Sequence, residues 1–178
     1  MIVAPHDILP QDLARLAVER YVTRAGTVAP PDHPADVLAQ HSGVFVTLRE
    51  ICGALRGCIG TIEPAFPNVA GEIIQNAINA ATKDPRFPEV SERELPNLVY
   101  GVDVLSAPER VAGLADLDPL RFGVIIEAQD GRRGLLLPRI DGIETVEQQW
   151  RAVHNKARVE PGAAVRIMRF TVRRFGKD

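Results

Sequence analysis

Val44–Glu50 (VFVTLRE) and Leu55–Ile62 (LRGCIGTI) decide the fold, because together they predict two antiparallel strands joined as a hairpin. A two-residue turn at Gly53-Ala54 predicts a register in which Arg49 faces Cys58. Side chains alternate between the two faces of a strand, so a one-residue slip would exchange the faces. The predicted register places Cys58 on a polar face with Phe45, Thr47, Arg49, Ile51, Arg56 and Ile62. The predicted core face carries Val44, Val46, Leu48, Glu50, Cys52, Leu55 and Ile59.

The hexapeptide Leu55–Gly60 (LRGCIG) combines three chemical features in six residues. Gly57 and Gly60 allow another molecule or segment to approach the backbone closely, because no Cβ intervenes. Arg56 offers a planar set of donors that suits carboxylate or phosphate. A thiol near a cation, such as Cys58, can act as a nucleophile. The alternative is a hairpin whose cysteine is simply packed in the interior.

Composition indicates one globular domain spanning residues 1–178, with 46% hydrophobic and 25% charged residues. The net charge of -2 gives no general attraction for nucleic acid or anionic membranes, and nucleic-acid binding is not expected. The basic residues of Arg166–Asp178 indicate a solvated strand instead. No run reaches the roughly 18 apolar residues of a membrane span. The N-terminal stretch has no basic region, which predicts a cytoplasmic protein with reduced Cys52 and Cys58.

Hydrophobic periodicity predicts helices over 10–25, over 68–83 with Asn68 as N-cap, and from Thr145 with a Gln148 capping box. Ser91 with Glu94 fits a capping box for a further short helix. His154 and Lys156 on the last helix are expected to face solvent. Strands are expected at 98–105, 123–128, 134–137 and 163–175, the middle two joined by a turn containing Asp130-Gly131. Hairpins with interspersed helices predict an α+β fold with an antiparallel sheet and flanking helices. The four histidines have no metal-ligand spacing, so no metal site is expected.

Several stretches, taken together, resemble the AMMECR-type domain family. The resemblance covers about residues 8–175, and LRGCIG with the downstream Asp84–Pro88 (DPRFP) is its most specific part. It extends to Phe45–Leu48, Thr61–Pro64, Glu94-Leu95, Val104–Ser106, Pro108-Glu109, Leu135–Pro138 and Lys156-Ala157. Arg158 stands where the family often has glycine, so that helix end is expected to be built differently.

The resemblance implies an AMMECR-type fold in which a larger subdomain holds both termini and a smaller part is inserted, with a cleft between them. In bacteria and archaea such proteins are identified as protein A of the AmmeMemoRadiSam system. They are encoded near Memo-like and radical-SAM proteins, which are therefore the expected pathway partners. The biochemical activity of the family is unsettled, and the resemblance indicates no particular cofactor.

The candidate site therefore combines the 45–62 hairpin with the 84–88 loop. Cys58 is the candidate reactive group, with its thiolate favoured by Arg49 and Arg56. The substrate-binding candidates are Thr47, Arg56, Gly57, Gly60, Asp84, Arg86 and Phe87. The expected activity is that of an enzyme or enzyme accessory acting on a small anionic substrate or a modified biomolecule. The alternative is a non-catalytic protein-interaction module that uses the same surface.

Each of these residues also has a structural alternative. Arg56 and Arg86 could instead form salt bridges with Glu50, Glu63 or Asp84. Asp84 could be a general base, a local cap or the partner of Arg86. Phe87 could stack on a ligand or anchor its loop to the body of the protein.

Overall fold

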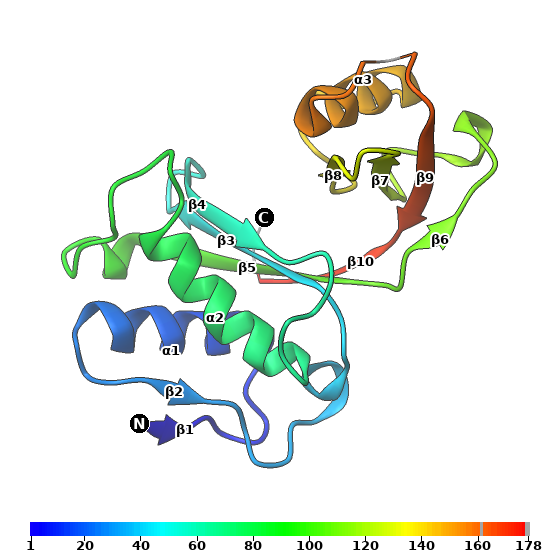
Figure 1. Ribbon diagram of the computed structural model, residues 1–178. Helices are drawn as coiled ribbons and strands as arrows, with labels where there is room; N and C mark the ends of the chain where they lie inside the picture. Colours follow the sequence, from blue (N-terminus) through cyan, green and yellow to red (C-terminus); the bar gives the residue numbers. More distant parts are fainter. Residues whose placement is uncertain (161, 177–178) are drawn as a thin grey trace. The chain divides into compact units, whose positions relative to one another are not determined.

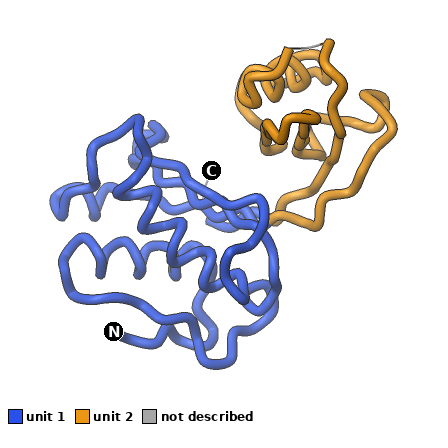
Figure 2. Tube along the Cα trace, viewed as in Figure 1, with its two compact units in different colours: residues 1–104, 174–178 blue, residues 105–173 orange. Residues whose placement is uncertain are grey.

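The computed structural model describes residues 1–160 and 162–176. The chain divides into two compact units, shown in Figure 2. Unit 1 comprises Met1–Val104 and the C-terminal segment from Arg174, and unit 2 comprises Leu105–Arg173. The predicted arrangement of a larger part that holds both termini and a smaller inserted part is therefore confirmed.

Unit 1 is built on a four-stranded sheet with the strand order β10-β5-β3-β4. Its strands are β3 (Val44–Glu50), β4 (Leu55–Gly60), β5 (Leu98–Leu105) and β10 (Val172–Phe175). β3 pairs antiparallel with both β4 and β5. A small parallel sheet of β1 (Ile2–Val3) and β2 (Val28–Ala29) completes the strands of this unit.

Two helices form the core of unit 1 with this sheet (Figure 1). α2 (Val69–Thr82) packs on β3 and β4, and α1 (Pro10–Val22) packs on α2. The side chain of Asn68 accepts a hydrogen bond from the Gly71 N–H, so the predicted N-cap of α2 is confirmed. The alternate β3 residues Val44, Val46 and Leu48 are fully buried, as expected for the core face of the hairpin. The short 3₁₀ helices η1 (Asp36–Ala39) and η2 (Leu95–Asn97) lie in connections.

The hairpin register differs from the predicted one. The connection is four residues long, Ile51–Ala54, and Gly53 adopts a φ of +92°. Leu48 pairs with Gly57 and Arg49 pairs with Leu55, so Arg56 is an extra residue in β4, a β-bulge. Cys58 consequently pairs with Thr47 rather than with Arg49. The faces of Cys58 and Ile59 remain as predicted because the net displacement is two residues, an even number.

The bulge and the longer turn overturn two further predictions about the core face. Leu55 pairs with Arg49, so it lies on the face opposite to the one predicted. Cys52 lies in the exposed turn, where its thiol donates to Glu50 Oε2 at 3.4 Å, and is not a core residue.

Unit 2 contains a second four-stranded sheet, covered by α3 (Val146–Ala157). The strands are β6 (Glu109–Arg110), β7 (Gly123–Ala128), β8 (Arg133–Leu136) and β9 (Val165–Phe170), in the order β6-β9-β7-β8, with η3 (Leu114–Asp116) between β6 and β7. Val124, Ile126 and Val153 are fully buried between sheet and helix. Both hydrogen bonds of the Thr145–Gln148 capping box are present, as predicted.

Two other predictions for the C-terminal part are wrong. The single strand predicted at 163–175 is two strands, β9 and β10, which belong to different sheets. The strand is interrupted at Thr171, which exchanges two hydrogen bonds with Ser106, one of them from Thr171 N to Ser106 Oγ. His154 is fully buried rather than solvent-facing, with its ring 4.1 Å from that of Trp150.

The structure therefore has the predicted α+β class, with two antiparallel four-stranded sheets and flanking helices. Lys177 and Asp178, part of the basic C-terminal segment, lie outside the described residues. In residues 1–160 and 162–176, no helix has the length and apolar character needed to span a membrane.

Candidate functional site

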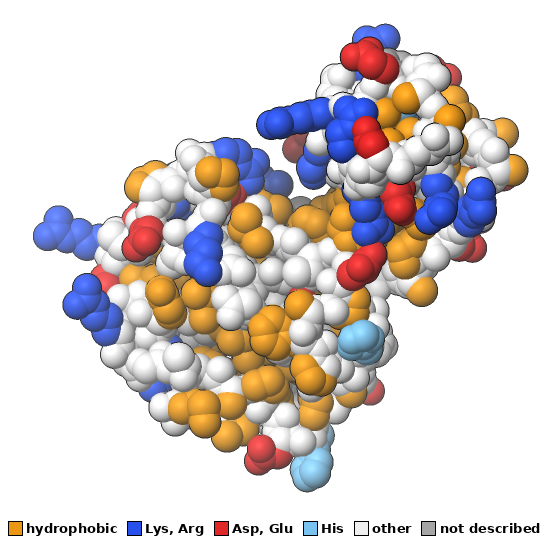
Figure 3. All heavy atoms as spheres, viewed as in Figure 1, with side chains coloured by type: hydrophobic (Ala, Val, Ile, Leu, Met, Phe, Trp, Pro, Cys, Tyr) orange, Lys and Arg blue, Asp and Glu red, His pale blue; other side chains and the backbone are white. Residues whose placement is uncertain are grey.

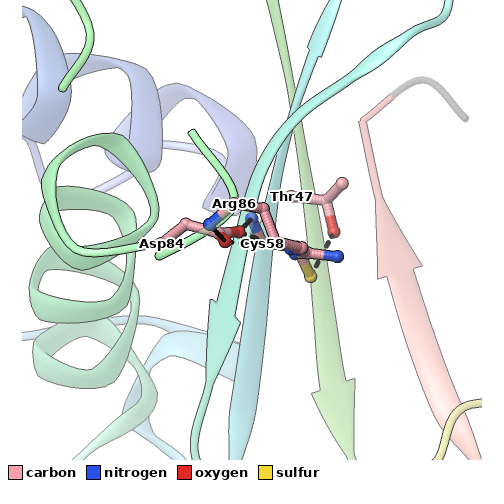
Figure 4. A network of polar contacts seen from close by, with 4 residues as sticks. All are labelled: Thr47, Cys58, Asp84 and Arg86. Atoms are coloured by element: carbon pink, nitrogen blue, oxygen red, sulfur yellow. Dashed lines mark hydrogen bonds and ion pairs between the residues drawn. The ribbon is translucent and has the colours of Figure 1, made fainter. Parts of the chain in front are cut away.

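Cys58 lies on the face of the unit 1 sheet opposite to the helices, next to Thr47 on the neighbouring strand. The Thr47 hydroxyl donates a hydrogen bond to Cys58 Sγ at 3.3 Å (Figure 4). Both side chains are half-buried, so the sulfur is neither sealed in the core nor fully exposed. A donor aimed at sulfur stabilises negative charge there, which is the form of a cysteine that reacts.

Asp84 connects the 84–88 loop to β4. It comes directly after α2, and its side chain is only 2% exposed. Asp84 Oδ2 accepts a hydrogen bond from the backbone N–H of Cys58 at 2.8 Å. This bond ties the loop to the strand at the residue that carries the thiol, as Figure 4 shows.

Asp84 also holds Arg86 in a two-point ion pair. Arg86 Nε lies 2.9 Å from Oδ1 and Nη2 lies 2.6 Å from Oδ2. The hydrogen bond from Arg86, helped by backbone N–H donors of Cys58 and Arg86, holds the pKa of Asp84 well below its usual range, against the opposing effect of burial. Both oxygens of Asp84 are occupied by these donors, so the geometry favours an anchoring role for Asp84 over that of a general base. The ion pair with Arg86 is one of the alternatives that the sequence left open.

Arg86 places a cation beside the thiol. The hydrogen bond with Asp84 is the main cause of its raised pKa, and charge on Cys58 adds a smaller contribution. Its side chain is 54% exposed. The bonds to Asp84 use Nε and one hydrogen of Nη2, which leaves the Nη1 edge available, since guanidinium carries five donors. The cation near Cys58 is therefore Arg86, whereas Arg49 donates to the Gly53 carbonyl at 3.1 Å.

Arg56, the extra residue of the bulge, is buried and paired with Glu94, a carboxylate that is not among the predicted partners. Its Nε lies 2.6 Å from Glu94 Oε1, and its side chain is only 8% exposed. Nη1 is buried with no hydrogen-bond partner among the described residues. Hydrogen bonds from Arg56, and then from Ser91, lower the pKa of Glu94 to about 2 against the effect of burial. The predicted partners Glu50, Glu63 and Asp84 are thus replaced by Glu94.

Phe87 lies close to both guanidinium groups. Its ring centre is 5.8 Å from Arg56 Cζ and 5.5 Å from Arg86 Cζ, distances typical of cation–π contacts. The ring is half-buried, and the Phe87 N–H donates to the Asp84 carbonyl at 3.1 Å. Phe87 therefore joins the Arg56–Glu94 pair and the Asp84–Arg86 pair into one cluster.

Gly57 and Gly60 allow close packing on either side of β4. A Cβ on Gly57 would lie 2.2 Å from the Ala80 carbonyl oxygen of α2. A Cβ on Gly60 would lie 2.3 Å from Cγ of Phe45. The first glycine lets α2 approach the strand, and the second lets the Phe45 ring lie across it.

The pairing of Glu94 with Arg56 is not predicted by the sequence, because Ser91 and Glu94 have the spacing of a local capping box. Glu94 Oε2 does accept from Ser91 N and Ser91 Oγ, at 2.8 and 2.7 Å. The second oxygen of the same carboxylate, however, binds Arg56, 38 residues away. The Ser-x-x-Glu spacing was the available signal, but it carries no information about a distant partner. Among the described residues, no group of three or more His, Cys, Asp or Glu side chains is arranged to bind a metal ion.

Comparison with known proteins places these features in a family. The AMMECR1 family profile matches residues 11–175. A Thermotoga maritima protein is 50% identical over 161 residues, covering 89% of this chain and 91% of that protein. A Clostridium acetobutylicum protein is 42% identical over 164 residues, which are 91% of this chain but only 34% of that protein.

A solved structure has the same fold. The crystal structure of uncharacterized protein PH0010 from Pyrococcus horikoshii superimposes with a TM-score of 0.86 at 33% sequence identity. The match covers 95% of this chain and 90% of the Pyrococcus chain. The match to the family profile over nearly the whole chain, and the close similarity to full-length relatives, show that this chain belongs to the AMMECR1 family.

Proposed function

We propose that the protein is an enzyme or enzyme accessory that holds a small anionic substrate, or an anionic part of a modified biomolecule, against Cys58. The observation that carries the proposal is the position of Cys58 between Thr47 and the loop that carries Arg86. Thr47 Oγ1 donates to Sγ, and Asp84 binds both the Cys58 N–H and the Arg86 guanidinium. An anion held by Arg86 therefore lies beside a thiol, the side chain that can act as the nucleophile.

Arg86 is the proposed anion-recognition group. Asp84 fixes the orientation of its guanidinium through two bonds, so an incoming anion meets a preorganised donor edge. More than half of the Arg86 side chain is exposed, whereas Arg56 is almost completely buried. Arg56 therefore supports Phe87 and the loop, and Arg86 contacts the substrate.

The proposed pathway context is the one that the family resemblance implies, with Memo-like and radical-SAM proteins as neighbours. A test is untargeted metabolite analysis of a deletion strain complemented with the wild-type, Cys58→Ser or Cys52→Ser gene. Cys52→Ser is the matched control, because Cys52 is exposed in the hairpin turn and remote in register from Thr47. We expect wild type and Cys52→Ser to restore the metabolite profile and Cys58→Ser to leave it altered. Full restoration by Cys58→Ser would exclude a reactive role for the thiol.

One observation favours the second candidate, a protein-interaction module. Both arginines of the cluster already have a carboxylate partner, and the half-buried Phe87 ring lies close to both guanidinium groups. Aromatic residues and arginine are typical of the centres of protein interfaces. Capture of the radical-SAM neighbour by wild type and Cys58→Ser, but not by Phe87→Ala, would favour this candidate over the enzyme.

A further inference from the structure

A hollow in unit 2 lies far along the chain from the thiol cluster and is lined by arginines. Its volume is about 330 Å³, within the range of small-molecule sites. The lining residues come from β6, from the end of β7 and from the start of β9: Arg110, Glu127, Ala128, Gln129, Ala164, Val165 and Arg166. Basic side chains are spread over the visible face of this unit, with acidic ones between them (Figure 3).

The sheet register explains why the charged side chains converge. Arg166 pairs with Glu127, and Arg110 pairs with Met168, two residues further along β9. Residues two apart on a strand share a face, so Arg110, Arg166 and Glu127 project to the same side of the sheet. Arg110 and Arg166 are diagonal neighbours, a separation that long side chains can bridge.

One carboxylate, that of Glu127, lies among the guanidinium groups at this position. Glu127 lies 3.5 Å from Arg166 Nη1 and 3.8 Å from Arg133 Nε, so it serves two arginines at long distances. Other arginine–carboxylate pairs in this protein are much closer, at 2.6 Å for Arg56–Glu94 and 2.7 Å for Arg174–Asp103. Well-formed charged hydrogen bonds are about 2.7–2.9 Å long. Counting Arg110 and Arg166 against Glu127, the lining of the hollow carries one net positive charge.

Arg110 adds a further cation to the hollow. Within residues 1–160 and 162–176, no ion pair or hydrogen bond involves its side chain, which is exposed. Two guanidinium groups that converge on one hollow can each bind two oxygens of a tetrahedral anion, which is the usual arginine–phosphate geometry. We propose that this hollow is a binding site for a small phosphate-bearing molecule, held by Arg110 and Arg166 and independent of the Cys58 cluster.

The test is a titration of the full chain with inorganic phosphate and with pyrophosphate at constant ionic strength. Binding is measured from the amide chemical shifts in NMR spectra recorded at each step. Constant ionic strength is required because exposed charges are screened by added salt. We expect saturable shifts centred on residues 110, 127–129 and 164–166, with pyrophosphate binding more tightly than phosphate. Citrate is the comparison anion, and tighter binding of citrate than of pyrophosphate would overturn the assignment to phosphate.

Four variants sharpen the test. Arg110→Gln and Arg166→Gln should each weaken pyrophosphate binding about tenfold or more, the cost of losing a charged hydrogen bond. Glu127→Gln should strengthen it about twofold to fivefold, because a competing carboxylate is removed. Arg151→Gln is the matched control: Arg151 is an exposed arginine of the same unit on α3, and its loss should leave binding unchanged.

Three results would overturn the proposal. The first is the absence of saturable shifts in the hollow. The second is an equal loss of binding in Arg151→Gln, which would show only general charge attraction. The third is binding of a single-stranded RNA oligonucleotide through Arg110 and Arg166 when pyrophosphate does not bind, which would indicate a nucleic-acid surface.

Discussion

Thr47 Oγ1 donates a hydrogen bond to Cys58 Sγ across the β3–β4 pair, at a distance of 3.3 Å. This relationship depends on the bulge at Arg56, because the bulge sets which β3 residue faces the thiol. The sulfur thus lies between a hydroxyl donor on one strand and a loop that contributes Asp84 and Arg86. The consequences of this arrangement can be measured one residue at a time.

Replacing Thr47 by valine should slow alkylation of Cys58 by iodoacetamide, because valine has a similar shape but cannot donate to sulfur. The measurement uses a Cys52→Ser background, in which Cys58 is the one remaining cysteine of the sequence's two. We expect the rate to fall about threefold to tenfold, as for loss of one hydrogen bond of about 1 kcal/mol. Thr47→Ser keeps the hydroxyl and should retain most of the rate. An unchanged rate in Thr47→Val would show that the hydrogen bond does not activate the thiol.

The Arg56–Glu94 pair should make stability depend on pH in acid. The pKa of Glu94 is lowered to about 2 on folding, so the unfolded state binds a proton more readily than the folded state. The stabilisation is therefore complete above the unfolded pKa, roughly 4.3, and is lost as pH falls from there toward about 2. Glu94→Gln should remove this contribution, which we place at about 1–2 kcal/mol because the carboxylate is partly exposed.

Urea unfolding from pH 7 to pH 2.5 measures this effect as the difference in unfolding free energy between wild type and Glu94→Gln. The difference should be constant at neutral pH and shrink below about pH 4.5. Glu92→Gln is the control, because Glu92 is exposed and two residues away. A difference that stays constant down to pH 2.5 would contradict the lowered pKa.

Gly57→Ala should destabilise unit 1. The added Cβ would lie 2.2 Å from the Ala80 carbonyl oxygen, and that atom belongs to helix backbone that cannot move alone. We expect a loss of about 1–3 kcal/mol in thermal or urea unfolding, the usual cost of overpacking. Gly113→Ala meets no atom within 4 Å and should change stability by less than about 0.5 kcal/mol. Equal effects of the two changes would show that the contact between β4 and α2 is not tight.

Arg158→Gly should stabilise the protein. Arg158 ends α3 with φ +54° and ψ +42°, the left-handed conformation in which a Cβ is unfavourable. The helix end thus has the geometry that favours glycine, although the residue is arginine. We expect a gain of about 0.5–1 kcal/mol in unfolding free energy. Arg158→Ala keeps the Cβ and should give no gain, so a similar gain in both variants would assign the effect to loss of the charged side chain.

Much of the fold could be predicted from local patterns. The strand over residues 44–50 and the caps at Asn68 and Thr145 depend on residues close in sequence, and all three were confirmed. The hairpin register could not be predicted, because the alternation of residue types does not reveal the bulge at Arg56 or the length of the turn. The break at Thr171 was missed for a similar reason: both halves of the 163–175 segment favour strand, and pairing with two different sheets separates them.

The candidate residues could be chosen from the sequence, but their contacts could not be predicted. Cys58 and Asp84 were both candidates, yet the bond from the Cys58 N–H to Asp84 joins residues 26 positions apart. The partner of Arg56 was missed because Glu94 already had a local explanation in the capping box with Ser91. Burial of His154 was also missed, since the tilted ring contact with Trp150 that accompanies it depends on how α3 packs in unit 2.

The central claim, that Cys58 reacts beside the cation of Arg86, is tested most directly by two alkylating reagents that differ in charge. Iodoacetate is anionic and iodoacetamide is neutral. The rate with iodoacetate divided by the rate with iodoacetamide therefore rises with positive charge near the sulfur. Each thiol is measured in the variant that lacks the other: Cys58 in Cys52→Ser, and Cys52 in Cys58→Ser. The ratio should be higher for Cys58, because the Cys52 thiol lies 3.4 Å from the Glu50 carboxylate.

Arg86→Gln should lower the Cys58 ratio about threefold to tenfold, the effect of removing one nearby charge in a watery site. Arg86→Lys keeps the charge and should retain most of the ratio, and neither change should affect Cys52. A Cys58 ratio that equals that of Cys52 and does not respond to Arg86→Gln would contradict the account.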